Sequence, residues 1–311
     1  MTYAIVHFWA ARGGFGKRME MLAGALACRG RVVRIRTIAA FWRLLRESSR
    51  RQPELALLVY TSLLAPLVAL VRAFRPSVRV YYMVRGDEVT WAIQRRRRWR
   101  GILARWLGRL MIAAGCRFVF ASQDLQEAFG QRLGRIPHAS VLPNTLGQPV
   151  PPSRPFDGRV AVVGDFGSVK NIETVIAALS GGDFRLDLFG NTHLPAHWQR
   201  PWLRAHGVVK DLPAQLAQCS LVVLASVSEG FPNVLLDALQ AGCGVVAHRD
   251  FPFRLLPLEE PWRFDPHVPG DLANVLGSLR RRQRVFSQDN PELLRLVESD
   301  WNEHVRRCLA A

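Results

Sequence analysis

The chain has 311 residues, of which 49% are hydrophobic, and its 42 Lys and Arg against 25 Asp and Glu give a net charge of +17. This length and this hydrophobic content are sufficient for two domains of ordinary size. The five cysteines are scattered without Cys-x-x-Cys spacing, which argues against a disulfide framework and against a zinc site. The first eight residues lack a basic stretch followed by an apolar one, so we expect a β-strand there and no signal peptide.

The excess of positive over negative charge lies entirely in the first half of the chain. Residues 1–150 carry 25 Lys and Arg and 7 Asp and Glu, whereas residues 151–311 carry 17 and 18. Only three of the basic residues are lysines, and genome composition can favour Arg over Lys. Composition bias does not explain why one half is charged and the other is neutral. The asymmetry therefore predicts a polyanionic partner for the first half.

The first half alternates between predicted strands and helices. Apolar runs predict strands at Ala4–Trp9, Val32–Ile35, Leu55–Tyr60, Val78–Val84, Phe118–Ala121 and Ser140–Leu142. A glycine-rich turn from Arg12 to Gly16 follows the first strand, and the apolar spacing of Lys17–Arg29 predicts a helix that Gly30 ends. Strands that are separated by helices imply a parallel sheet.

Residues 55–71 contain no charged side chain, a length that approaches that of a membrane-spanning helix. Pro66 interrupts this run, however, and Tyr60-Thr61-Ser62 is typical of the end of a strand. We therefore expect a buried strand followed by a short core helix.

A basic segment with interspersed tryptophans follows the fourth predicted strand. Its central residues are Arg95, Arg96, Arg97, Arg98, Trp99 and Arg100. On a helix, Trp91, Ile102 and Trp106 would share one flank with arginines beside them, and such helices lie on anionic membranes. Nucleic-acid binding uses the same composition, but the chain shows no zinc-finger, RRM or KH signature. We favour an anionic membrane surface over nucleic acid, and a merely solvated arginine face is the third interpretation.

Four prolines between Gln148 and Phe156 predict a linker between two domains. We expect a basic, membrane-facing domain at 1–150, a second domain at 151–290, and a C-terminal helix at 291–311. In the second domain, apolar runs predict strands at Arg159–Val163, Leu186–Phe189, Leu221–Leu224 and Gly244–Ala247, with a helix at Val169–Leu179.

The segment Ser228–Leu239 carries the strongest functional signal. Glu229 and Asp237, eight positions apart, bracket a Gly-Phe-Pro-Asn turn that follows an apolar strand and precedes a helix-like run. Backbone N–H groups at a helix N-terminus can hold an anion. The arrangement suits a ligand with a phosphate at its middle and hydroxyl groups at both ends, and a nucleotide sugar fits that description.

This segment resembles the glutamate-x7-glutamate signature of retaining glycosyltransferases of the GT-B fold, family 4, and the resemblance extends over most of the chain. It implies an α/β fold with two Rossmann-like, doubly wound domains that face a cleft, the C-terminal one binding the nucleotide sugar. In the family the first acid contacts the donor sugar and the second contacts the ribose, which gives these roles to Glu229 and Asp237. Asp237 departs from the family's glutamate by one methylene group. The turn that faces the diphosphate comprises Gly230, Phe231, Pro232, Asn233 and Val234.

Other segments are similar to further donor-binding motifs of the family. Lys170 matches the lysine of the phosphate clamp, but Asp165 stands after Gly164 where an arginine is usual, so the second cation is missing or is supplied elsewhere, for example by Arg12. The loop over the donor phosphates corresponds to Gly13 and Gly14. The loop whose backbone reads the nucleobase corresponds to Val209, Lys210, Asp211 and Leu212.

The first domain carries the residues that the resemblance places near the acceptor. Arg85 stands at a strand end where many family members have a histidine, and Asp87 follows it. Arg85 would stabilise phosphate and Asp87 would orient the acceptor hydroxyl, unless Asp87 and Glu88 merely cap the next helix. Asn144 lies in a segment that resembles the Pro-Asn-Gly sequence before the linker, with Thr145 in place of glycine.

The sequence thus predicts a hexosyltransferase that moves a sugar, with retention of configuration, from a nucleotide-diphosphate sugar to a glycan or lipid-linked acceptor of the lipopolysaccharide or exopolysaccharide type. Catalysis would involve Glu229, Lys170, Arg85 and Asp87. The resemblance implies that no cofactor and no metal is needed, which is consistent with the lack of an Asp-x-Asp motif near a strand end. We expect a cytoplasmic protein, peripheral on the inner face of the cell membrane, with nucleic acid an unlikely partner. The alternative is a non-catalytic relative that binds a nucleotide sugar or an anionic polymer, which the departures at Asp165, Asp237 and Arg85 would support.

Overall fold

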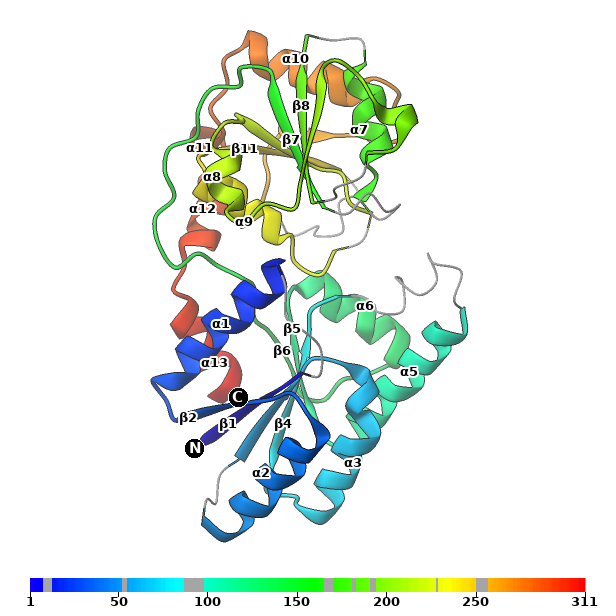
Figure 1. The fold of residues 1–311 in the computed structure, drawn as a ribbon, viewed down its shortest axis with the longest axis vertical. Helices are drawn as coiled ribbons and strands as arrows, with labels where there is room; N and C mark the ends of the chain where they lie inside the picture. Colours follow the sequence, from blue (N-terminus) through cyan, green and yellow to red (C-terminus); the bar gives the residue numbers. More distant parts are fainter. Residues whose placement is uncertain are drawn as a thin grey trace. The chain divides into compact units, whose positions relative to one another are not determined.

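The computed structural model describes residues 1–7, 13–51, 55–86, 98–164, 170–180, 183–190, 194–227, 229–249 and 257–310. The chain divides into two compact units. Unit 1 comprises Met1–Asn144 together with Trp301–Ala311, and unit 2 comprises Thr145–Asp300. Each unit is built on a parallel β-sheet with helices on both faces (Figure 1).

The described part of unit 1 contains a six-stranded sheet in the order β2-β1-β3-β4-β5-β6. Its strands are β1 (Thr2–Val6), β2 (Arg31–Ile35), β3 (Leu55–Val59), β4 (Arg79–Val84), β5 (Arg117–Phe120) and β6 (Ala139–Val141). β1 and β3 are buried along their whole length, because a parallel sheet is covered on both faces and its central strands are continuous apolar runs. All six strands predicted in the first half are present, with their ends displaced by a few residues.

Helices cover both faces of this sheet. They are α1 (Gly13–Ala27), α2 (Ile38–Arg51), the 3-10 turn η1 (Ser62–Leu64), α3 (Ala65–Phe74), α5 (Arg98–Ala113), α6 (Gln123–Leu133) and α13 (Trp301–Ala310). The chain moves one way from β1 to β2 and the other way from β2 through to β6. Since parallel crossovers are right-handed, α1 lies on one face with α13, and α2, α3, α5 and α6 lie on the other (Figure 1).

The uncharged run at 55–71 forms β3, η1 and most of α3, as expected. Pro66 lies in the first turn of α3, where a missing N–H group is tolerated. No helix in the described part of the chain is both long and apolar enough to cross a membrane. The expectation of a core helix is only half right, however, because Leu70 and Phe74 of α3 are exposed to solvent.

The C-terminal tail divides between the two units. α12 (Pro291–Glu298) belongs to unit 2, whereas α13 belongs to unit 1. Trp301 and Val305 are buried in the same core cluster as residues of β1, β3 and β4. The Tyr81 hydroxyl also donates a hydrogen bond to the Leu309 carbonyl oxygen at 3.0 Å. The last helix therefore completes the core of unit 1, although unit 2 separates it from the rest of that unit in the sequence.

Unit 2 contains, in its described part, a six-stranded parallel sheet in the order β12-β11-β10-β7-β8-β9. The strands are β7 (Arg159–Val163), β8 (Arg185–Phe189), β9 (Leu203–Gly207), β10 (Leu221–Leu224), β11 (Gly244–His248) and β12 (Arg263–Phe264). α7 (Ile172–Leu179) packs with α10 (Asp271–Arg281), and α8 (Leu212–Leu216) packs with α9 (Asn233–Gln240) on the other face (Figure 1). The 3-10 turn η3 (Ala196–Trp198) and α11 (Phe286–Asp289) complete the unit.

We predict that Trp301→Ala lowers the free energy of unfolding by about 3–5 kcal/mol, because it leaves a cavity in the core of unit 1. Trp301 is only 5% exposed, and its Nε1 finds no hydrogen-bond partner among the described residues. Trp301→Phe keeps much of the ring and removes that unpaired donor, so it should cost less than half as much. Chemical denaturation followed by circular dichroism measures both, and equal losses would contradict this account of α13.

Candidate functional site

The strand order of unit 2 reverses between β7 and β10. The chain leaves β7 toward β9 and later leaves β10 toward β12, in the opposite direction. Open α/β sheets bind ligands at such a point, in the crevice outside the carboxyl ends of the two strands. Gly164 follows β7 and Glu229 lies in the connection after β10. The topology therefore brings the predicted donor-binding segments to the same end of the sheet.

Lys170 and Glu229 are in direct contact at this crevice. The distance between Lys170 Nζ and Glu229 Oε1 is 2.5 Å. Only 21% of the lysine side chain and 17% of the glutamate side chain are exposed. Charges that have lost most of their hydration are stable only when they are paired, and here each supplies the partner of the other. Two residues predicted for separate roles, one at the diphosphate and one at the sugar, thus form a single ion pair.

The aliphatic stem of Lys170 lies directly over Gly164. A Cβ atom added at Gly164 would lie between 2.7 and 2.9 Å from three carbon atoms of this stem. Gly164 has a φ of +152°, and Asn171, between Lys170 and α7, is left-handed with a φ of +49°. Asparagine is among the few residues that adopt this conformation at low cost. Only a glycine at position 164 therefore leaves room for the lysine to cross toward Glu229.

Gly190, at the end of β8, supports Gly164 from the neighbouring strand. The Gly164 N–H donates to the Phe189 carbonyl oxygen at 2.9 Å, and the Gly190 N–H donates to the Gly207 carbonyl oxygen at 2.8 Å. A Cβ atom at Gly190 would collide with the Gly164 carbonyl oxygen, and the φ of Gly190 is +122°. The carboxyl ends of β7, β8 and β9 thus form a floor of closely packed backbone beneath Lys170.

The N-terminus of α9 faces the same end of the sheet as the ion pair. Pro232 is the N-cap residue of the helix, and its side chain accepts no hydrogen bond from the first N–H groups. Such groups carry a partial positive charge and favour an anion. Phe231 is buried and fixes the turn, whereas Asn233, Val234 and Asp237 are half-buried, with Asp237 one turn into the helix. A lysine and a helix N-terminus therefore stand together where the sequence predicts a diphosphate.

The segment after β9 is the one predicted to contact the nucleobase, and its Asp211 side chain is used to cap a helix. Asp211 accepts a hydrogen bond from the Ala214 N–H at 3.2 Å and caps α8. Lys210 is exposed, Val209 and Leu212 are half-buried, and Val208 is 75% exposed. The backbone of this segment, rather than the Asp211 carboxylate, is the part that remains for ligand recognition.

Two residues that we predicted separately in the first domain are joined in unit 1. Arg85, just after β4, donates from Nη1 to Asn144 Oδ1 at 3.3 Å and to the Leu142 carbonyl oxygen at 3.4 Å. Burial lowers the pKa of Arg85, and the neighbouring Tyr60 opposes this shift. Burial likewise raises the pKa of Tyr60, against the effect of Arg85. These polar groups meet at the carboxyl ends of β3, β4 and β6.

The expectation for Gly13 and Gly14 requires a correction. They do not form a turn before a helix that begins at Lys17, because α1 begins at Gly13 itself. Helix N-termini leave their first N–H groups without intrahelical partners, so this position still suits phosphate binding. Several predicted residues lie outside the described ones, namely Arg12, Asp87, Arg95, Arg96, Arg97 and Asp165. Arg98 begins α5, Trp99 is exposed, and Arg100 is half-buried with its guanidinium 5.1 Å from the centre of the Trp99 ring.

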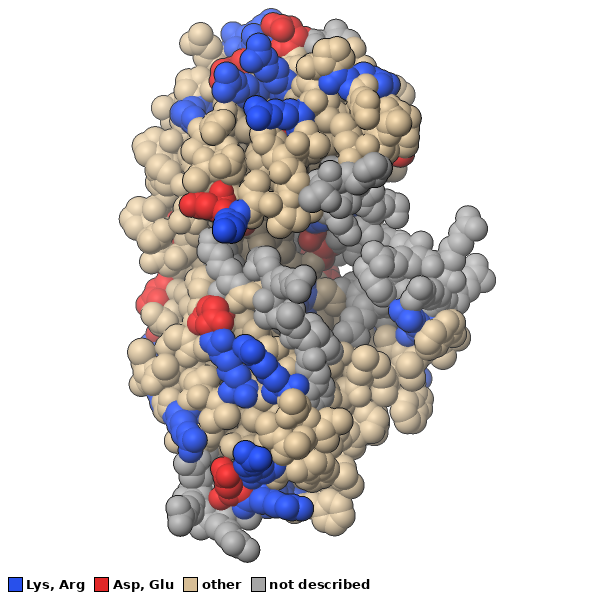
Figure 2. Space-filling model, in the orientation of Figure 1, with Lys and Arg blue, Asp and Glu red and all other residues tan. Residues whose placement is uncertain are grey.

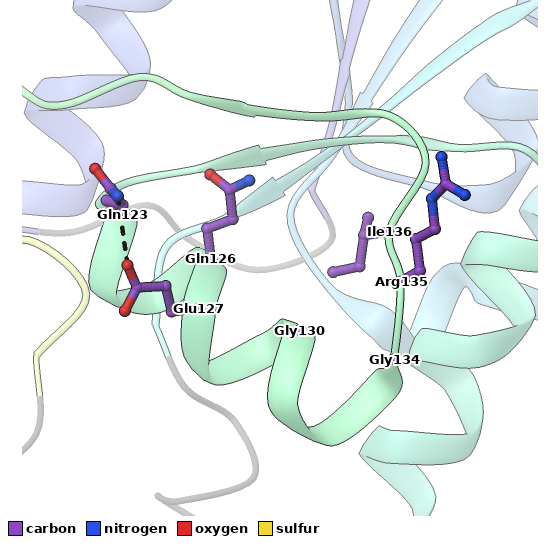
Figure 3. Close-up of a pocket in the computed structure, with 7 residues that line it drawn as sticks. All are labelled: Gln123, Gln126, Glu127, Gly130, Gly134, Arg135 and Ile136. Atoms are coloured by element: carbon purple, nitrogen blue, oxygen red, sulfur yellow. Dashed lines mark hydrogen bonds between the residues drawn. The ribbon is translucent and has the colours of Figure 1, made fainter.

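Two features were not predicted from the sequence. In unit 2, His206 Nε2 lies 2.5 Å from Asp187 Oδ1, and the His206 ring stacks on Phe189 at 4.5 Å. In unit 1, a hollow of about 460 Å³ lies beside α6 (Figure 3). It is lined by Gln123, Gln126, Glu127, Gly130, Gly134, Arg135 and Ile136. The only sequence signal for the contact between His206 and Asp187 was the alternation of polar residues in a strand. The only sequence signal for the hollow was the polar face of α6.

The described residues contain no group of three or more His, Cys, Asp or Glu side chains that could hold a metal ion. Lys170 and the N-terminus of α9 supply positive charge at the crevice. This arrangement can hold a phosphate group next to a carboxylate that accepts hydrogen bonds from hydroxyl groups.

Comparison with known proteins identifies the architecture. Residues 158–275 match the family model described as Glycosyl transferases group 1. No curated protein matches the chain by sequence. Among solved structures, sucrose-phosphate synthase from Thermosynechococcus elongatus has a TM-score of 0.77 at 15% identity, covering 99% of this chain and 97% of that chain.

Two further structures extend the comparison. Anabaena HepE in complex with UDP and glucose has a TM-score of 0.71 at 15% identity, covering 100% of this chain and 98% of that chain. The lipopolysaccharide outer core galactosyltransferase WaaB has a TM-score of 0.66 at 12% identity, covering 100% and 99%. The matched segment contains both Lys170 and Glu229. Residues 158–275 therefore match the glycosyl transferases group 1 model, and the two α/β units have the GT-B fold of these solved structures.

Proposed function

We propose that the protein transfers a sugar, with retention of configuration, from a nucleotide-diphosphate sugar to a glycan or lipid-linked acceptor. The observation that carries this proposal is the Lys170–Glu229 ion pair at the point where the strand order of unit 2 reverses. The cation and the helix N-terminus match the charged diphosphate of such a donor, and the carboxylate matches its hydroxyl-rich sugar. The similarity to a structure that contains UDP and glucose supports the same donor class.

Each group at the crevice has a role in this proposal. The diphosphate binds at the N-terminus of α9, and Lys170 neutralises the charge that grows on it as the glycosidic bond breaks. Glu229 accepts hydrogen bonds from the sugar hydroxyls, and Asp237 from the ribose. The backbone of 209–212 contacts the nucleobase. When the donor binds, its phosphate thus becomes the partner of Lys170 in place of Glu229. The sugar hydroxyl groups become the partners of Glu229 in place of Lys170.

The reaction exchanges one bond for another at the anomeric carbon. The bond from this carbon to the phosphate oxygen breaks, the acceptor oxygen bonds on the same side, and the acceptor proton passes to a phosphate oxygen. No protein nucleophile is required by this front-side path. Lys170 and the α9 N–H groups supply the electrostatic stabilisation, so we propose that no divalent metal ion is required.

The acceptor belongs, in this proposal, to unit 1. Arg85 and Asn144 present a guanidinium and an amide at the carboxyl edge of its sheet, and Asp87 is proposed to orient the acceptor hydroxyl. The similarity to a lipopolysaccharide galactosyltransferase supports an acceptor of the lipopolysaccharide or exopolysaccharide type. We place the protein in the cytoplasm, peripheral on the inner face of the cell membrane, where lipid-linked acceptors are found.

We predict that one nucleoside diphosphate among UDP, GDP, ADP and CDP raises the melting temperature by several degrees. A ligand at about 100 times its dissociation constant stabilises the folded state by about 2.7 kcal/mol. Lys170→Ala should weaken this binding about tenfold or more, since it removes a charge-assisted hydrogen bond. Arg204→Ala, which removes an exposed cation in β9, is the control and should bind normally. Equal shifts for Lys170→Ala and the wild type, each against its own ligand-free melting temperature, would contradict the phosphate role.

We predict that Glu229→Gln reduces transfer about 10- to 100-fold, because a neutral amide accepts weaker hydrogen bonds from the sugar hydroxyls. Glu173→Gln is the matched control, since Glu173 is in the same unit with 74% of its side chain exposed.

Proton NMR of the product should show the anomeric configuration of the donor, and EDTA should leave the rate unchanged. Inversion, or loss of activity in EDTA, would contradict the retaining or the metal-independent part of the proposal.

We predict that Gly190→Ala weakens nucleotide binding without touching the nucleotide. Its Cβ atom must displace the Gly164 carbonyl, and the strained backbone costs about 1–3 kcal/mol. Gly24→Ala is the control, because a Cβ atom there meets nothing within 4 Å and alanine favours helix α1 by about 0.5–1 kcal/mol. Isothermal titration measures the affinity of both, and unchanged affinity for Gly190→Ala would show that the floor does not position Lys170.

A further inference from the structure

A broad apolar surface covers the outer side of two helices in unit 1. We define the α3–α5 face by its exposed large side chains, which are 38–78% accessible: Leu63, Leu70, Phe74, Trp99, Ile102, Leu103 and Trp106. Single exposed apolar residues are ordinary, but a contiguous group of this size marks an interaction surface.

The exposed residues follow the period of the helices. In η1 and α3, Leu63, Leu70 and Phe74 recur at spacings of seven and four, opposite the buried Val68 and Val71. α5 repeats this pattern, with Trp99, Ile102 and Trp106 on its outer side. A helix at the surface of a soluble protein normally has a polar outer stripe. These two helices instead have apolar residues on both their buried and their exposed sides. The exposed apolar stripe therefore indicates an interaction surface.

The two outer stripes form one surface. α3 and α5 connect β3 to β4 and β4 to β5 in the same direction, so they lie side by side on one face of the sheet (Figure 1). Arg72 Nε, near the end of α3, donates to the carbonyl oxygen of Ala114, which follows α5, at 3.1 Å. Figure 2 is mainly tan over α3 and tan with blue over α5.

The charges on this surface have a single sign. η1, α3 and α5 contain no Asp or Glu. Arg105 and Arg109 lie among the apolar residues of α5 and are exposed, and the Arg100 guanidinium stacks over Trp99. An interface with another protein usually has acidic as well as basic groups on each surface, whereas this face has only basic ones. A bilayer of anionic lipids offers phosphates over an apolar interior, which matches arginines among apolar side chains. Tryptophan and arginine are the side chains that favour this boundary.

We propose that the α3–α5 face binds an anionic lipid bilayer, with Phe74, Ile102 and Trp106 entering the headgroup region and Arg105 and Arg109 contacting lipid phosphates. The basic segment at 95–100 was predicted for this purpose from the sequence. The flank of Ile102 and Trp106 was predicted with it, and the structure adds the exposed side of α3, which the charge pattern did not indicate. The face therefore depends on apolar insertion as well as on charge.

The position of the face links it to the acceptor. α3 and α5 run antiparallel to the strands. Leu63, in the η1 turn before α3, and Trp99, in the first turn of α5, therefore lie toward the end of the sheet where Arg85 meets Asn144. A bilayer on this face would lie beside the edge to which we assign a lipid-linked acceptor. This link rests on the proposed function, but bilayer binding does not, because it can be measured without donor or acceptor.

The test is flotation of the full chain with vesicles of phosphatidylcholine containing about one-third phosphatidylglycerol. The wild type should float with these vesicles at low salt and not with pure phosphatidylcholine. Ile102→Gln combined with Trp106→Gln should lower the partition coefficient about tenfold or more. Arg109→Gln should lower it about fivefold, which corresponds to about 1 kcal/mol for one cation at an anionic surface.

Matched controls are Val268→Gln and Arg204→Gln, which change an exposed valine and an exposed arginine of unit 2 and should float like the wild type. Since the substituted side chains are exposed, every variant should keep the wild-type melting temperature. The proposal is overturned if the wild type does not float, or if the double variant floats as well as the wild type. It is also overturned if sedimentation velocity shows that the double variant merely converts a dimer to a monomer, or if the face binds duplex DNA more tightly than the vesicles.

Discussion

The ion pair between Lys170 and Glu229 is the interaction on which the candidate site depends. Two charged side chains that are mostly removed from water would each carry a large desolvation penalty if they stood alone. Paired at 2.5 Å, each holds the other in place at the carboxyl edge of the sheet. A ligand that offers only an anion or only hydroxyl groups would separate the pair and leave one charge unsatisfied. The nucleotide sugar of the proposed function would satisfy both, because it combines the two chemistries.

Backbone geometry, more than side-chain identity, fixes that pair. The lysine stem reaches Glu229 only because Gly164 has no Cβ atom, and Gly164 keeps its place because Gly190 approaches its carbonyl group equally closely. The turn at Asn171 then directs the chain into α7. The pair therefore depends on three consecutive strand ends of the parallel sheet. Substitutions in this floor and substitutions of the charged residues should consequently affect the same property, namely the position of the lysine ammonium group.

The sequence was sufficient for the six strands of unit 1 and for β7, β8, β10 and β11, because each depends on local pattern, but it did not predict β9 and β12. Central parallel strands are apolar runs, and Glu229, Asp237 and Lys170 stand at motif spacings. The contacts between these residues were not predictable, since they depend on strand order. Arg85 and Asn144 are far apart in the chain and meet only because β4 and β6 end at one edge. The start of α1 at Gly13 was missed because glycine normally indicates a turn.

The apolar run at 55–71 shows the limit of hydrophobicity as a guide to burial. Its charge-free composition correctly indicated a buried strand, but it gave no sign that the helix would turn Leu70 and Phe74 outward. Burial on one side of α3 explains Val68 and Val71, whereas the packing among the described residues of unit 1 does not require large apolar side chains on the other. The same excess occurs on α5, next to arginines and without acidic residues. This combination, in the described residues of η1, α3 and α5, of exposed apolar side chains with arginines and no acidic residues is the reason that we propose a lipid bilayer as the partner of this face.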